Sequence, residues 1–326
     1  MFDVVSLGSA TLDVFLKSRE FALVSKDGTK EICVAYGGKL EVEEIHFDTG
    51  GGGTNSAVTF ARQGLKIASI VKIGDDFAGK KVREDLESEE VDTSLVVEEK
   101  NGYTDYSTLL WAPEGGRTAL VYRGKTRLEV EEVPWDRLQT KWFYISSVEG
   151  NLEIVQEIQR YKDTKIQSKI AWNPGGKELE QKEKVLELLP GVEVLNLNKE
   201  EMEELVGGDE GGGGIEGLLK KARELPCRYV IITDDRWGSY LWQKDAGFWL
   251  WSGIYDTPKV EATGAGDAYG SGFTAGLIKG MEIEDCLRLA AANASSVVLY
   301  PGAKKGILKM DKTDEWFGKE LKLKKI

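Results

Sequence analysis

Several kinds of residue are scarce in this chain of 326 residues, and each scarcity argues against a class of protein. The three cysteines are far apart and odd in number, so neither a disulfide framework nor a cysteine zinc site is indicated. The single histidine, His46, cannot form a metal cluster by itself. No apolar run approaches the roughly 20 residues of a membrane-spanning helix, and the N-terminus lacks the pattern of a signal peptide. We therefore expect a reduced, cytoplasmic protein.

Positive charge is also in short supply. Lys and Arg number 43 against 55 Asp and Glu, which gives a formal net charge of −12. Because binding to a nucleic acid requires clustered positive charge, a nucleic acid is not the expected partner. A small phosphorylated ligand remains compatible, since a few oriented N–H groups can hold it. Hydrophobic residues make up 41% of the chain, enough for a substantial core.

Apolar runs alternate with amphipathic stretches along most of the chain. We expect strands at residues 3–7, 67–73, 142–146, 170–172, 192–197 and 228–233. We expect helices at residues 54–64, 78–89, 152–161, 182–189, 199–205, 215–224, 266–280 and 283–299. This alternation predicts a parallel sheet with helices on both faces. The C-terminal residues 319–326 read as a helix end or a frayed tail.

Two segments interrupt this alternation, at residues 15–47 and 103–123. Both alternate Val, Tyr, Thr and Leu around turn signals, namely Lys26-Asp27-Gly28 and Glu114-Gly115-Gly116. They predict two β-hairpins, which can join into a small separate sheet. Such a sheet would form a lid over the carboxyl ends of the parallel strands, where ligands bind in these folds. The alternative is that the hairpins extend the main sheet at an edge.

The first motif with chemical content is Thr49–Asn55, TGGGGTN, directly before a predicted helix. Its glycines allow the backbone to approach a ligand closely, and the helix start offers free N–H groups. Asn55 can both donate to and accept from a polyol hydroxyl. A tight turn without a ligand is the alternative. The motif lacks the Gly-Lys-Ser/Thr of a Walker A loop, and no strand is predicted directly before it, as a dinucleotide fingerprint would require.

The second motif is Ala262–Phe273, ATGAGDAYGSGF. Gly264, Ala265 and Gly266 form a small-residue turn, and Asp267 stands at the start of an apolar helix. Successive backbone N–H groups at such a turn make an anion nest. A carboxylate there is ordinarily a helix cap. Beside an anion nest it also meets the needs of phosphoryl transfer, in which a base takes the hydroxyl proton and fixed donors stabilise the transferred group.

Together the two motifs resemble the signatures of the PfkB (ribokinase-like) family of sugar and nucleoside kinases. The similarity runs over nearly the whole chain and includes GSATLDVF near the N-terminus, KIGDDFAGKKV at residues 72–82, and NKEE at residues 198–201. The resemblance implies an α/β fold, with a ribokinase-like three-layer parallel-sheet core and a small β-sheet lid. It implies a single kinase domain over residues 1–326, with lid insertions near 15–47 and 103–123.

The resemblance also implies roles for individual residues. The catalytic base would be Asp267, and the anion hole for the γ-phosphate would be formed by Gly264, Ala265 and Gly266. The substrate-binding positions match Asp13, Gly51, Gly52, Gly53, Asn55 and, more loosely, Glu149. The nucleotide-binding positions match Asn198, Thr233, Gly238 and Asn293. Asn198 and Glu201 match the pair that organises Mg²⁺, which keeps much of its hydration when bound.

Two departures from the family pattern affect these expectations. The nucleotide loop at residues 233–238 carries Asp235 where glycine is usual. Glu261 stands where an aspartate usually binds a monovalent cation such as K⁺, and glutamate is one methylene longer. The second cation loop matches Pro301–Ala303.

The function implied is an ATP-dependent kinase that transfers the γ-phosphate to a hydroxymethyl group of a sugar, as ribokinases and fructokinases do. ATP and Mg²⁺ are expected, K⁺ is an open question, and open lid edges favour a homodimer. A nucleoside kinase is the alternative, because Phe21, Tyr36 and Phe47 of the first insertion can cover a base. A non-catalytic sugar or nucleotide sensor is a further alternative. An NAD-dependent oxidoreductase is disfavoured, since only Gly8 is available for a fingerprint after the first strand.

Overall fold

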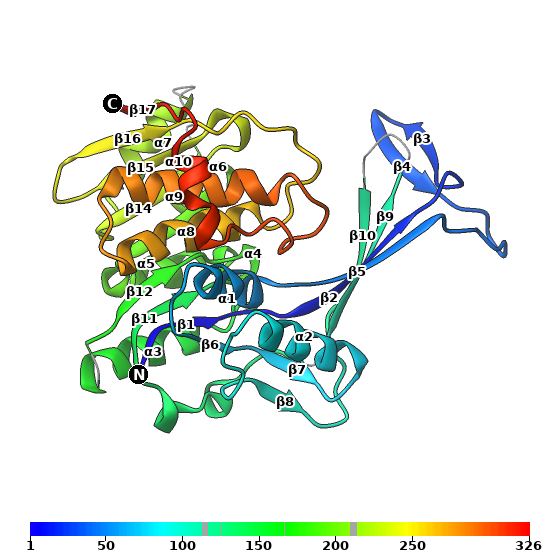
Figure 1. Ribbon diagram of the computed structural model, residues 1–326, viewed down its shortest axis with the longest axis horizontal. Coiled ribbons are helices and arrows are strands. Elements are labelled where there is room, and N and C mark those ends of the chain that lie inside the picture. The colour runs from blue at the N-terminus through cyan, green and yellow to red at the C-terminus, as the bar shows by residue number, and fades with distance from the viewer. Residues whose placement is uncertain (113–116, 125, 166, 209–213) are drawn as a thin grey trace.

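The structure is a computed structural model that describes residues 1–112, 117–124, 126–165, 167–208 and 214–326. Its centre is a nine-stranded sheet with the strand order β17-β16-β15-β14-β13-β12-β11-β1-β6 (Figure 1). The parallel strands are buried runs rich in Val, Ile and Leu, as expected for a sheet covered on both faces. They are β1 (Phe2–Leu7), β6 (Ile67–Ile70), β11 (Thr140–Ile145), β12 (Lys169–Trp172), β13 (Val194–Asn198) and β14 (Tyr229–Thr233).

Helices cover both faces of this sheet, and each layer encloses its own hydrophobic cluster. One layer contains α1 (Gly52–Arg62), α2 (Phe77–Ser88), α8 (Ala265–Ile278), α9 (Ile283–Val297) and α10 (Thr313–Phe317). The other contains α3 (Leu152–Lys165), α4 (Gly176–Leu179), α5 (Lys182–Leu188), α6 (Lys199–Val206) and α7 (Gly214–Ala222). The predicted fold class, a three-layer α/β core, is confirmed. Among the described residues, no helix is long and apolar enough to cross a membrane.

One edge of the sheet differs from the prediction, because three strands there run antiparallel. They are β15 (Ser239–Gln243), β16 (Phe248–Ser252) and β17 (Leu323–Lys325). The interpretation of residues 319–326 as a helix end or tail was wrong. Leu321 is buried, Leu323 is half-buried, and the lysines between and after them are more exposed, which is the period of two of an edge strand.

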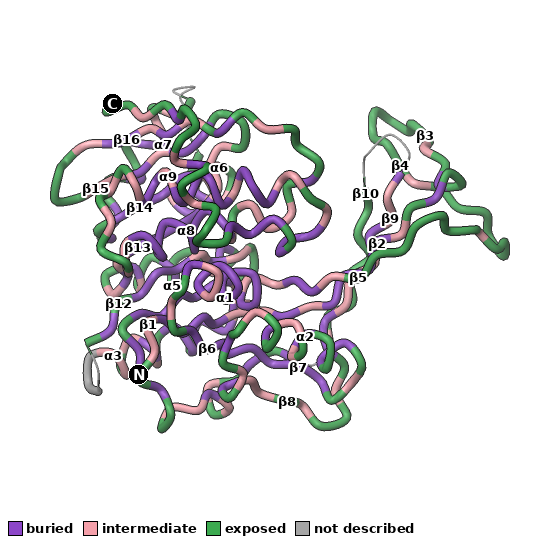
Figure 2. The backbone as a smooth tube through the Cα atoms, in the orientation of Figure 1, coloured by how far each residue is buried: buried purple, intermediate pink, exposed green. Residues whose placement is uncertain are grey.

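A second sheet of four strands stands apart from the core, with the order β10-β9-β2-β5 (Figure 1). Its strands are β2 (Thr11–Lys17), β5 (Glu44–Gly50), β9 (Asp105–Trp111) and β10 (Arg117–Tyr122). We call this sheet the lid, together with the small hairpin of β3 (Ala22–Lys26) and β4 (Thr29–Cys33) at its end. The hairpins thus join into a separate sheet and do not extend the main one. Figure 2 shows that much of the lid is exposed, in contrast to the buried core.

The turns of the lid agree with the sequence where the structure describes them. Asp27 and Gly28 have φ of 50° and 83°, the conformation that a two-residue hairpin turn requires. The predicted turn Glu114-Gly115-Gly116 lies outside the described residues. Two short strands, β7 (Lys72–Gly74) and β8 (Val97–Glu99), pair beside α2. Single 3₁₀ turns occur at Val130–Glu132, Trp135–Arg137, Leu189–Gly191, Asp235–Trp237 and Met310–Lys312.

A strand leads directly into the glycine motif, where the sequence predicted none. The lid strand β5 ends at Gly50 and α1 begins at Gly52. Gly51 alone separates them, with a φ of 92°. Only residues up to Phe47 were assigned to the first hairpin, because the glycines conceal the end of the strand. The lid and the first helix of the core are therefore joined through one residue.

Candidate active site

The two sequence motifs meet in space although they are far apart in the chain. Asn55, on α1, donates a hydrogen bond from Nδ2 to Oδ2 of Asp267, on α8, over 2.9 Å. Burial raises the pKa of the Asp267 carboxyl, and the hydrogen bond from Asn55 acts in the opposite direction. A carboxylate with a raised pKa is a better proton acceptor near neutral pH than an exposed one.

The glycine motif brings the backbone of α1 against this carboxylate. Gly51 has a φ of 92°, which residues with a side chain rarely adopt. A Cβ atom on Gly52 would lie 2.7 Å from Oγ of Ser146 and 3.2 Å from Oδ1 of Asp267. A Cβ atom on Gly53 would meet the backbone that follows β1. A larger residue at Gly52 would therefore displace the Asp267 carboxylate or the strand end beside it.

The start of α8 offers backbone donors beside Asp267. Gly264 caps the helix in the left-handed conformation, with a φ of 76°. The N–H group of Ala265 donates to the carbonyl of Ala262. The N–H groups of Gly266 and Asp267 have no acceptor within the described residues. Free N–H groups at a helix N-terminus, with the helix dipole behind them, form an anion nest.

A cavity of about 520 Å³ opens beside this nest, within the usual size range of small-molecule sites. Ala265 and Gly266 form part of its wall. Three of the predicted nucleotide-binding residues also line it, namely Asn198, Thr233 and Gly238. The structure therefore brings the expected nucleotide loop and the expected anion hole to one cavity.

Asn293 of α9, the fourth predicted nucleotide residue, does not line this cavity. Its side chain is fully buried and donates to the carbonyl of Ala268 over 2.8 Å. Its Oδ1 accepts the N–H of Leu308 over 2.8 Å, so it ties α9 to its neighbours. The residues of α9 that do line the cavity share another face of the helix and are Ala291, Ala294 and Ser295.

The unexpected acid of the nucleotide loop has a partner. Nζ of Lys259 lies 2.8 Å from Oδ1 of Asp235, and both residues line the cavity. This ion pair lowers the pKa of the Asp235 carboxyl. Asp235 has a φ of 42°, which is consistent with the glycine expected at this position. The pairing with Lys259 offsets a negative charge that would otherwise face the cavity.

Asn198 and Glu201 form a reciprocal capping box at the start of α6. Oδ1 of Asn198 accepts the N–H of Glu201 over 2.8 Å, and Oε2 of Glu201 accepts the N–H of Asn198 over 2.9 Å. Burial raises the pKa of the Glu201 carboxyl, and the negative charge of Asp267 contributes in the same direction. Oε1 of Glu201 accepts no hydrogen bond within the described residues. The pair is thus fixed by the helix cap, with one carboxylate oxygen left for a hydrated cation.

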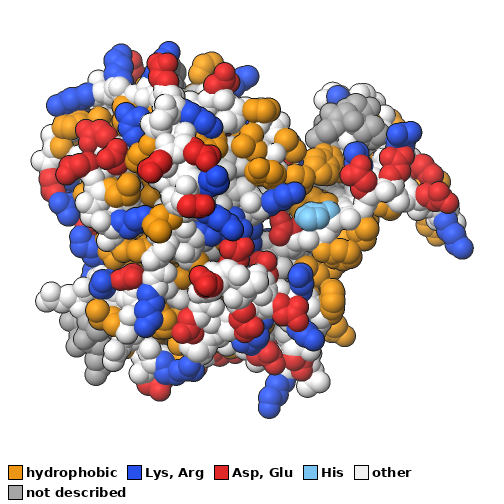
Figure 3. Space-filling model, viewed as in Figure 1, with side chains coloured by type: hydrophobic (Ala, Val, Ile, Leu, Met, Phe, Trp, Pro, Cys, Tyr) orange, Lys and Arg blue, Asp and Glu red, His pale blue; other side chains and the backbone are white. Residues whose placement is uncertain are grey.

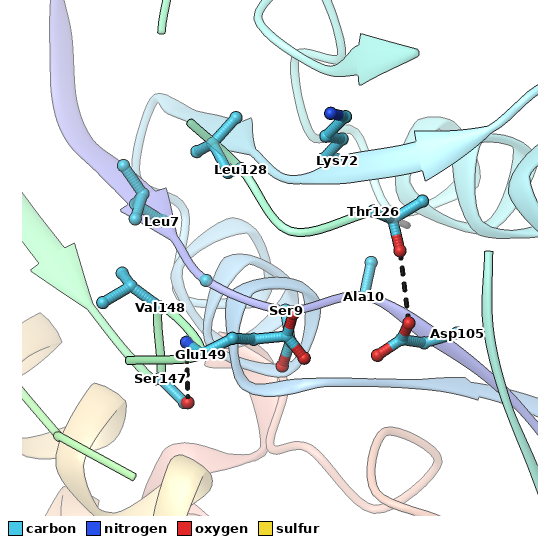
Figure 4. A pocket seen from close by; sticks show the side chains of 11 residues that line it. Leu7, Ser9, Ala10, Lys72, Asp105, Thr126, Leu128, Ser147, Val148 and Glu149 are labelled. Atoms are coloured by element: carbon cyan, nitrogen blue, oxygen red, sulfur yellow. Dashed lines mark hydrogen bonds between the residues drawn. The ribbon is translucent and has the colours of Figure 1, made fainter. Parts of the chain in front are cut away.

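A second pocket lies beside the glycine motif (Figure 4). Its wall includes Ser9, whose carbonyl accepts the N–H of Gly53 over 3.1 Å. Glu149, a predicted substrate-binding residue, and Asp105 also line this pocket, together with Thr126 and Ser147. Burial and the nearby Asp105 raise the pKa of the Glu149 carboxyl. The pocket itself has a volume of about 20 Å³, which is room for about one water molecule or one hydroxyl group of a ligand.

The loop that carries Glu149 is held by a residue that sequence reasoning missed. Glu178, at the start of α4, is fully buried and accepts the N–H groups of Val148 and Gly150 over 2.9 and 2.6 Å. It also accepts a hydrogen bond from the Ser147 hydroxyl. Glu149 itself has a φ of 55°, an unusual value for a residue with a side chain. A buried carboxylate surrounded by donors therefore fixes a strained loop at the edge of the pocket.

Asp13 lies in the lid, on β2, and among the described residues no hydrogen bond joins it to Asn55 or Asp267. It faces Asp48 of β5 and Ser107 of β9 in the strand register. Burial and the charge of Asp48 raise the pKa of the Asp13 carboxyl, whereas a hydrogen bond from Ser107 acts in the opposite direction. Asp13 is thus placed where the lid meets the core, next to Gly50 at the end of β5.

Glu261, the expected cation ligand, is buried between two loops. Its Oε2 accepts the N–H of Gly302 over 3.0 Å, and its Oε1 accepts the Thr263 hydroxyl over 2.6 Å. Arg117, the first residue of lid strand β10, forms an ion pair with the same carboxylate. The role of Arg117 was also missed from sequence, because a lone arginine beside a glycine turn gives no signal of a partner 144 positions away.

Comparisons with known proteins identify the family of the chain. Residues 1–310 match the pfkB family of carbohydrate kinases. A 5-dehydro-2-deoxygluconokinase of Shouchella clausii is 28% identical over 318 residues, which cover 91% of this chain and 90% of that protein. A cytidine kinase of Thermococcus kodakarensis is 26% identical, over 76% of this chain and 87% of its own length.

The fold has close counterparts among solved structures. Arabidopsis thaliana ribokinase, complexed with ribose and ATP, superposes with a TM-score of 0.78 at 20% identity, over 97% of this chain and 99% of that one. The nucleoside kinase of Methanocaldococcus jannaschii gives a TM-score of 0.75 at 20% identity, over 96% and 97%. The family match extends through the lid as well as the sheet and both motifs. The chain therefore belongs to the pfkB family of carbohydrate kinases, which are phosphotransferases with an alcohol group as acceptor.

Proposed function

We propose that this protein uses ATP to phosphorylate a hydroxymethyl group of a sugar, with Asp267 as the catalytic base. One observation carries the proposal: the Asp267 carboxylate accepts a hydrogen bond from Asn55 and belongs to the first turn of α8, where two N–H groups have no acceptor among the described residues. A base and an anion nest side by side are the two elements that phosphoryl transfer to a hydroxyl requires.

The proton transfer is assigned to one oxygen of Asp267. Its Oδ2 accepts the hydrogen bond from Asn55, whereas its Oδ1 accepts none within the described residues. Oδ1 is therefore the atom that takes the proton of the acceptor hydroxyl. Asn55 holds the carboxylate in place during this step, and the raised pKa of Asp267 makes the proton transfer easier near neutral pH.

Backbone N–H groups at the start of α8 would stabilise the charge on the transferred group. Those of Gly266 and Asp267 have no acceptor in the part of the chain that the structure describes, and Gly266 borders the cavity proposed for ATP. The donors present also fit Mg²⁺, since oxygen ligands suit this hard cation and Oε1 of Glu201 can accept a bond from its water shell. When bound, Mg²⁺ would neutralise charge on the phosphates. Asn198 would hold Glu201 in position through the capping box.

The carboxylates and hydroxyls that line the small pocket beside Glu149 support a site for one hydroxyl group of a sugar acceptor. A nucleoside is the second candidate, and a specific feature of the lid favours it. A cavity of about 510 Å³ between the lid and the core is lined by Phe15, His46 and Trp111. The ring of Phe15 lies 5.9 Å from that of His46 and 6.4 Å from that of Trp111. Figure 3 shows the hollow between lid and core edged by hydrophobic side chains, and aromatic rings there can stack on a base.

An acceptor panel tests the proposal. ADP release would be measured with ATP and Mg²⁺ and with ribose, fructose, 2-keto-3-deoxygluconate or nucleosides as acceptors. We expect turnover with a sugar, and the Asp267→Asn variant serves as the inactive control. Faster turnover of a nucleoside than of every sugar would establish the alternative. Binding of a sugar and ATP without ADP release would indicate a sensor.

The proposal includes a homodimer through the lid and a cytoplasmic location. Leu120, Val121 and Tyr122 of β10 are exposed on an edge strand, where pairing with a second copy would cover them. Sedimentation of the wild type and of Val121→Lys tests this, since a charge on the edge should shift a dimer toward monomer. A cytoplasmic location agrees with the three free cysteines, Cys33, Cys227 and Cys286.

A further inference from the structure

The buried carboxylate of Glu261 links the two loops that frame the start of α8. It accepts hydrogen bonds from Thr263, next to the helix cap Gly264, and from the N–H of Gly302. A Cβ atom on Gly264 would lie 2.6 Å from that of Ala303, so the two loops are also packed together. A negative charge at this position acts directly on the loops that shape the anion nest.

A buried carboxylate needs a compensating positive charge, because two neutral hydrogen bonds do not replace its lost hydration. The side chain of Glu261 is 6% exposed, and Arg117 of the lid forms an ion pair with it. The Arg117 side chain is 36% exposed, so it reaches the carboxylate from the solvent side. Burial lowers the pKa of the Arg117 guanidinium, and the charge of Asp13, also in the lid, acts in the opposite direction.

Among the residues that the structure describes, those around Glu261 do not leave an open site for a monovalent cation. Both carboxylate oxygens accept hydrogen bonds, and the guanidinium supplies the positive charge. A K⁺ ion would have to displace Arg117 and gather oxygen ligands there. We propose that Arg117 takes the place of a monovalent cation beside Glu261, so that this enzyme works without K⁺. The positive charge of Arg117 then reaches Glu261 when the lid closes on the core.

The inference rests on the proposed kinase function, but part of its test does not depend on activity. The full chain would be unfolded by heat in KCl, NaCl and choline chloride at equal ionic strength. For the wild type we expect the same Tm in all three salts. For Arg117→Met, where Glu261 loses its partner, we expect a Tm that is higher in KCl than in choline chloride. Arg19→Met, another lid arginine with an exposed partner, Glu43, is the matched control and should show no such difference.

The same proteins would then be compared in ADP release with the best acceptor of the panel. For the wild type we expect equal rates in KCl and in choline chloride. For Arg117→Met we expect the rate in choline chloride to fall about tenfold, which corresponds to about 1.4 kcal/mol of lost stabilisation. KCl should restore part of this rate. Arg117→Lys keeps the charge and should retain most of the activity.

Two results would overturn the inference. One is a wild-type rate or Tm that rises with K⁺ but not with choline. The other is an Arg117→Met variant that is indistinguishable from Arg19→Met in every salt. Absence of ADP release with all acceptors would instead contradict the proposed function, and the salt dependence of Tm would still decide the role of Arg117.

Discussion

At the scale of single residues, Asp267 combines two requirements that oppose each other. Burial makes its carboxylate a stronger base but makes its charged form less stable in the folded protein. Its folded-state pKa is raised, so the unfolded chain ionises at lower pH, and the site loses stability as the pH rises between these two pKa values. The hydrogen bond from Asn55 offsets part of this cost.

The Asp267→Asn variant separates these two effects. We expect kcat to fall about 10²- to 10⁴-fold because only the base is lost. An asparagine oxygen can still accept the bond from Asn55, so Tm at pH 7 should be unchanged or higher. In the wild type, activity should fall on the acid side as the pH drops through the raised pKa of Asp267. A variant that retains more than about a tenth of the wild-type kcat would remove Asp267 from this role.

Glu201 allows the cation role to be separated from the helix cap. Glu201→Gln keeps an oxygen that can accept the N–H of Asn198, but it removes the charge. We expect activity to fall at low Mg²⁺ and to recover partly at high Mg²⁺, with an apparent Mg²⁺ affinity about 10- to 100-fold weaker. Glu204→Gln, on the exposed side of the same helix, is the matched control. Equal Mg²⁺ dependence of the two variants would mean that only the bulk charge of α6 matters.

At the scale of elements, the start of α8 contains two glycines with different constraints. Gly264 has a positive φ, and a Cβ atom there would lie 2.6 Å from Cβ of Ala303. Gly266 has ordinary helical geometry, and a Cβ atom there would meet no atom within 4 Å. Since Gly266 also lines the cavity proposed for ATP, we expect a phosphate group to lie against it.

This contrast gives a paired prediction. Gly264→Ala should lower the stability of the fold, by about 1–2 kcal/mol from the left-handed backbone alone, and lower activity with it. Gly266→Ala should leave Tm unchanged but raise KM for ATP about tenfold, a cost of about 1.4 kcal/mol. Thermal unfolding and initial rates measure both. A drop in Tm for Gly266→Ala as large as for Gly264→Ala would contradict the assignment of Gly266 to the phosphate position.

Hydrophobic patterning predicted the core elements but not all of their partners. Strands β1, β11 and β14 could be predicted from their apolar runs, because strands covered on both faces must be apolar. The lysine-rich strand β17 was missed, because an edge strand exposes one face and its neighbours lie far back in the chain. Residue contacts across long separations, such as Asn55 with Asp267, came within reach only through the resemblance of the motifs to a known family.

The same limit explains why the sequence did not predict every contact around the candidate site. Asn293 belongs to the helix that borders the cavity, but the residues of α9 that line the cavity are its neighbours, because successive residues of a helix point about 100° apart. Arg117 and Glu178 carry no local motif, since their effect depends on which loops fold against them. Which charged residues pair depends on tertiary packing, and such pairing produces no periodic pattern in the sequence.

At the scale of the whole molecule, acceptor binding is expected to bring lid and core together. Asp13 stands where they meet, and a ligand shifts a conformational equilibrium only by contacting its states differently. We expect Asp13→Ala to raise KM for the acceptor about 10- to 100-fold, as loss of a charged hydrogen bond of about 1.5–3 kcal/mol implies. It should also lower kcat and leave ATP affinity without acceptor nearly unchanged.

Water should then compete better for the phosphoryl group, because a less firmly closed lid admits it. The measurement is the amount of ADP formed per acceptor phosphate formed, in wild type and variant. We expect this ratio to rise in Asp13→Ala. If both the ratio and KM for the acceptor stay at their wild-type values, Asp13 is only a structural residue of β2.

Gly51 alone joins β5 of the lid to α1 of the core, so a movement of the lid would turn about a point close to the proposed catalytic base. A rotation of β5 about Gly51 is transmitted through one turn of helix to Asn55, and from there to the Asp267 carboxylate. An acceptor whose shape prevents full closure of the lid would therefore shift the Asp267 carboxylate out of position, even while the acceptor stays bound. Discrimination between similar acceptors should accordingly appear in kcat more than in KM. The protein would then select its substrate by the rate of phosphoryl transfer and not by binding affinity.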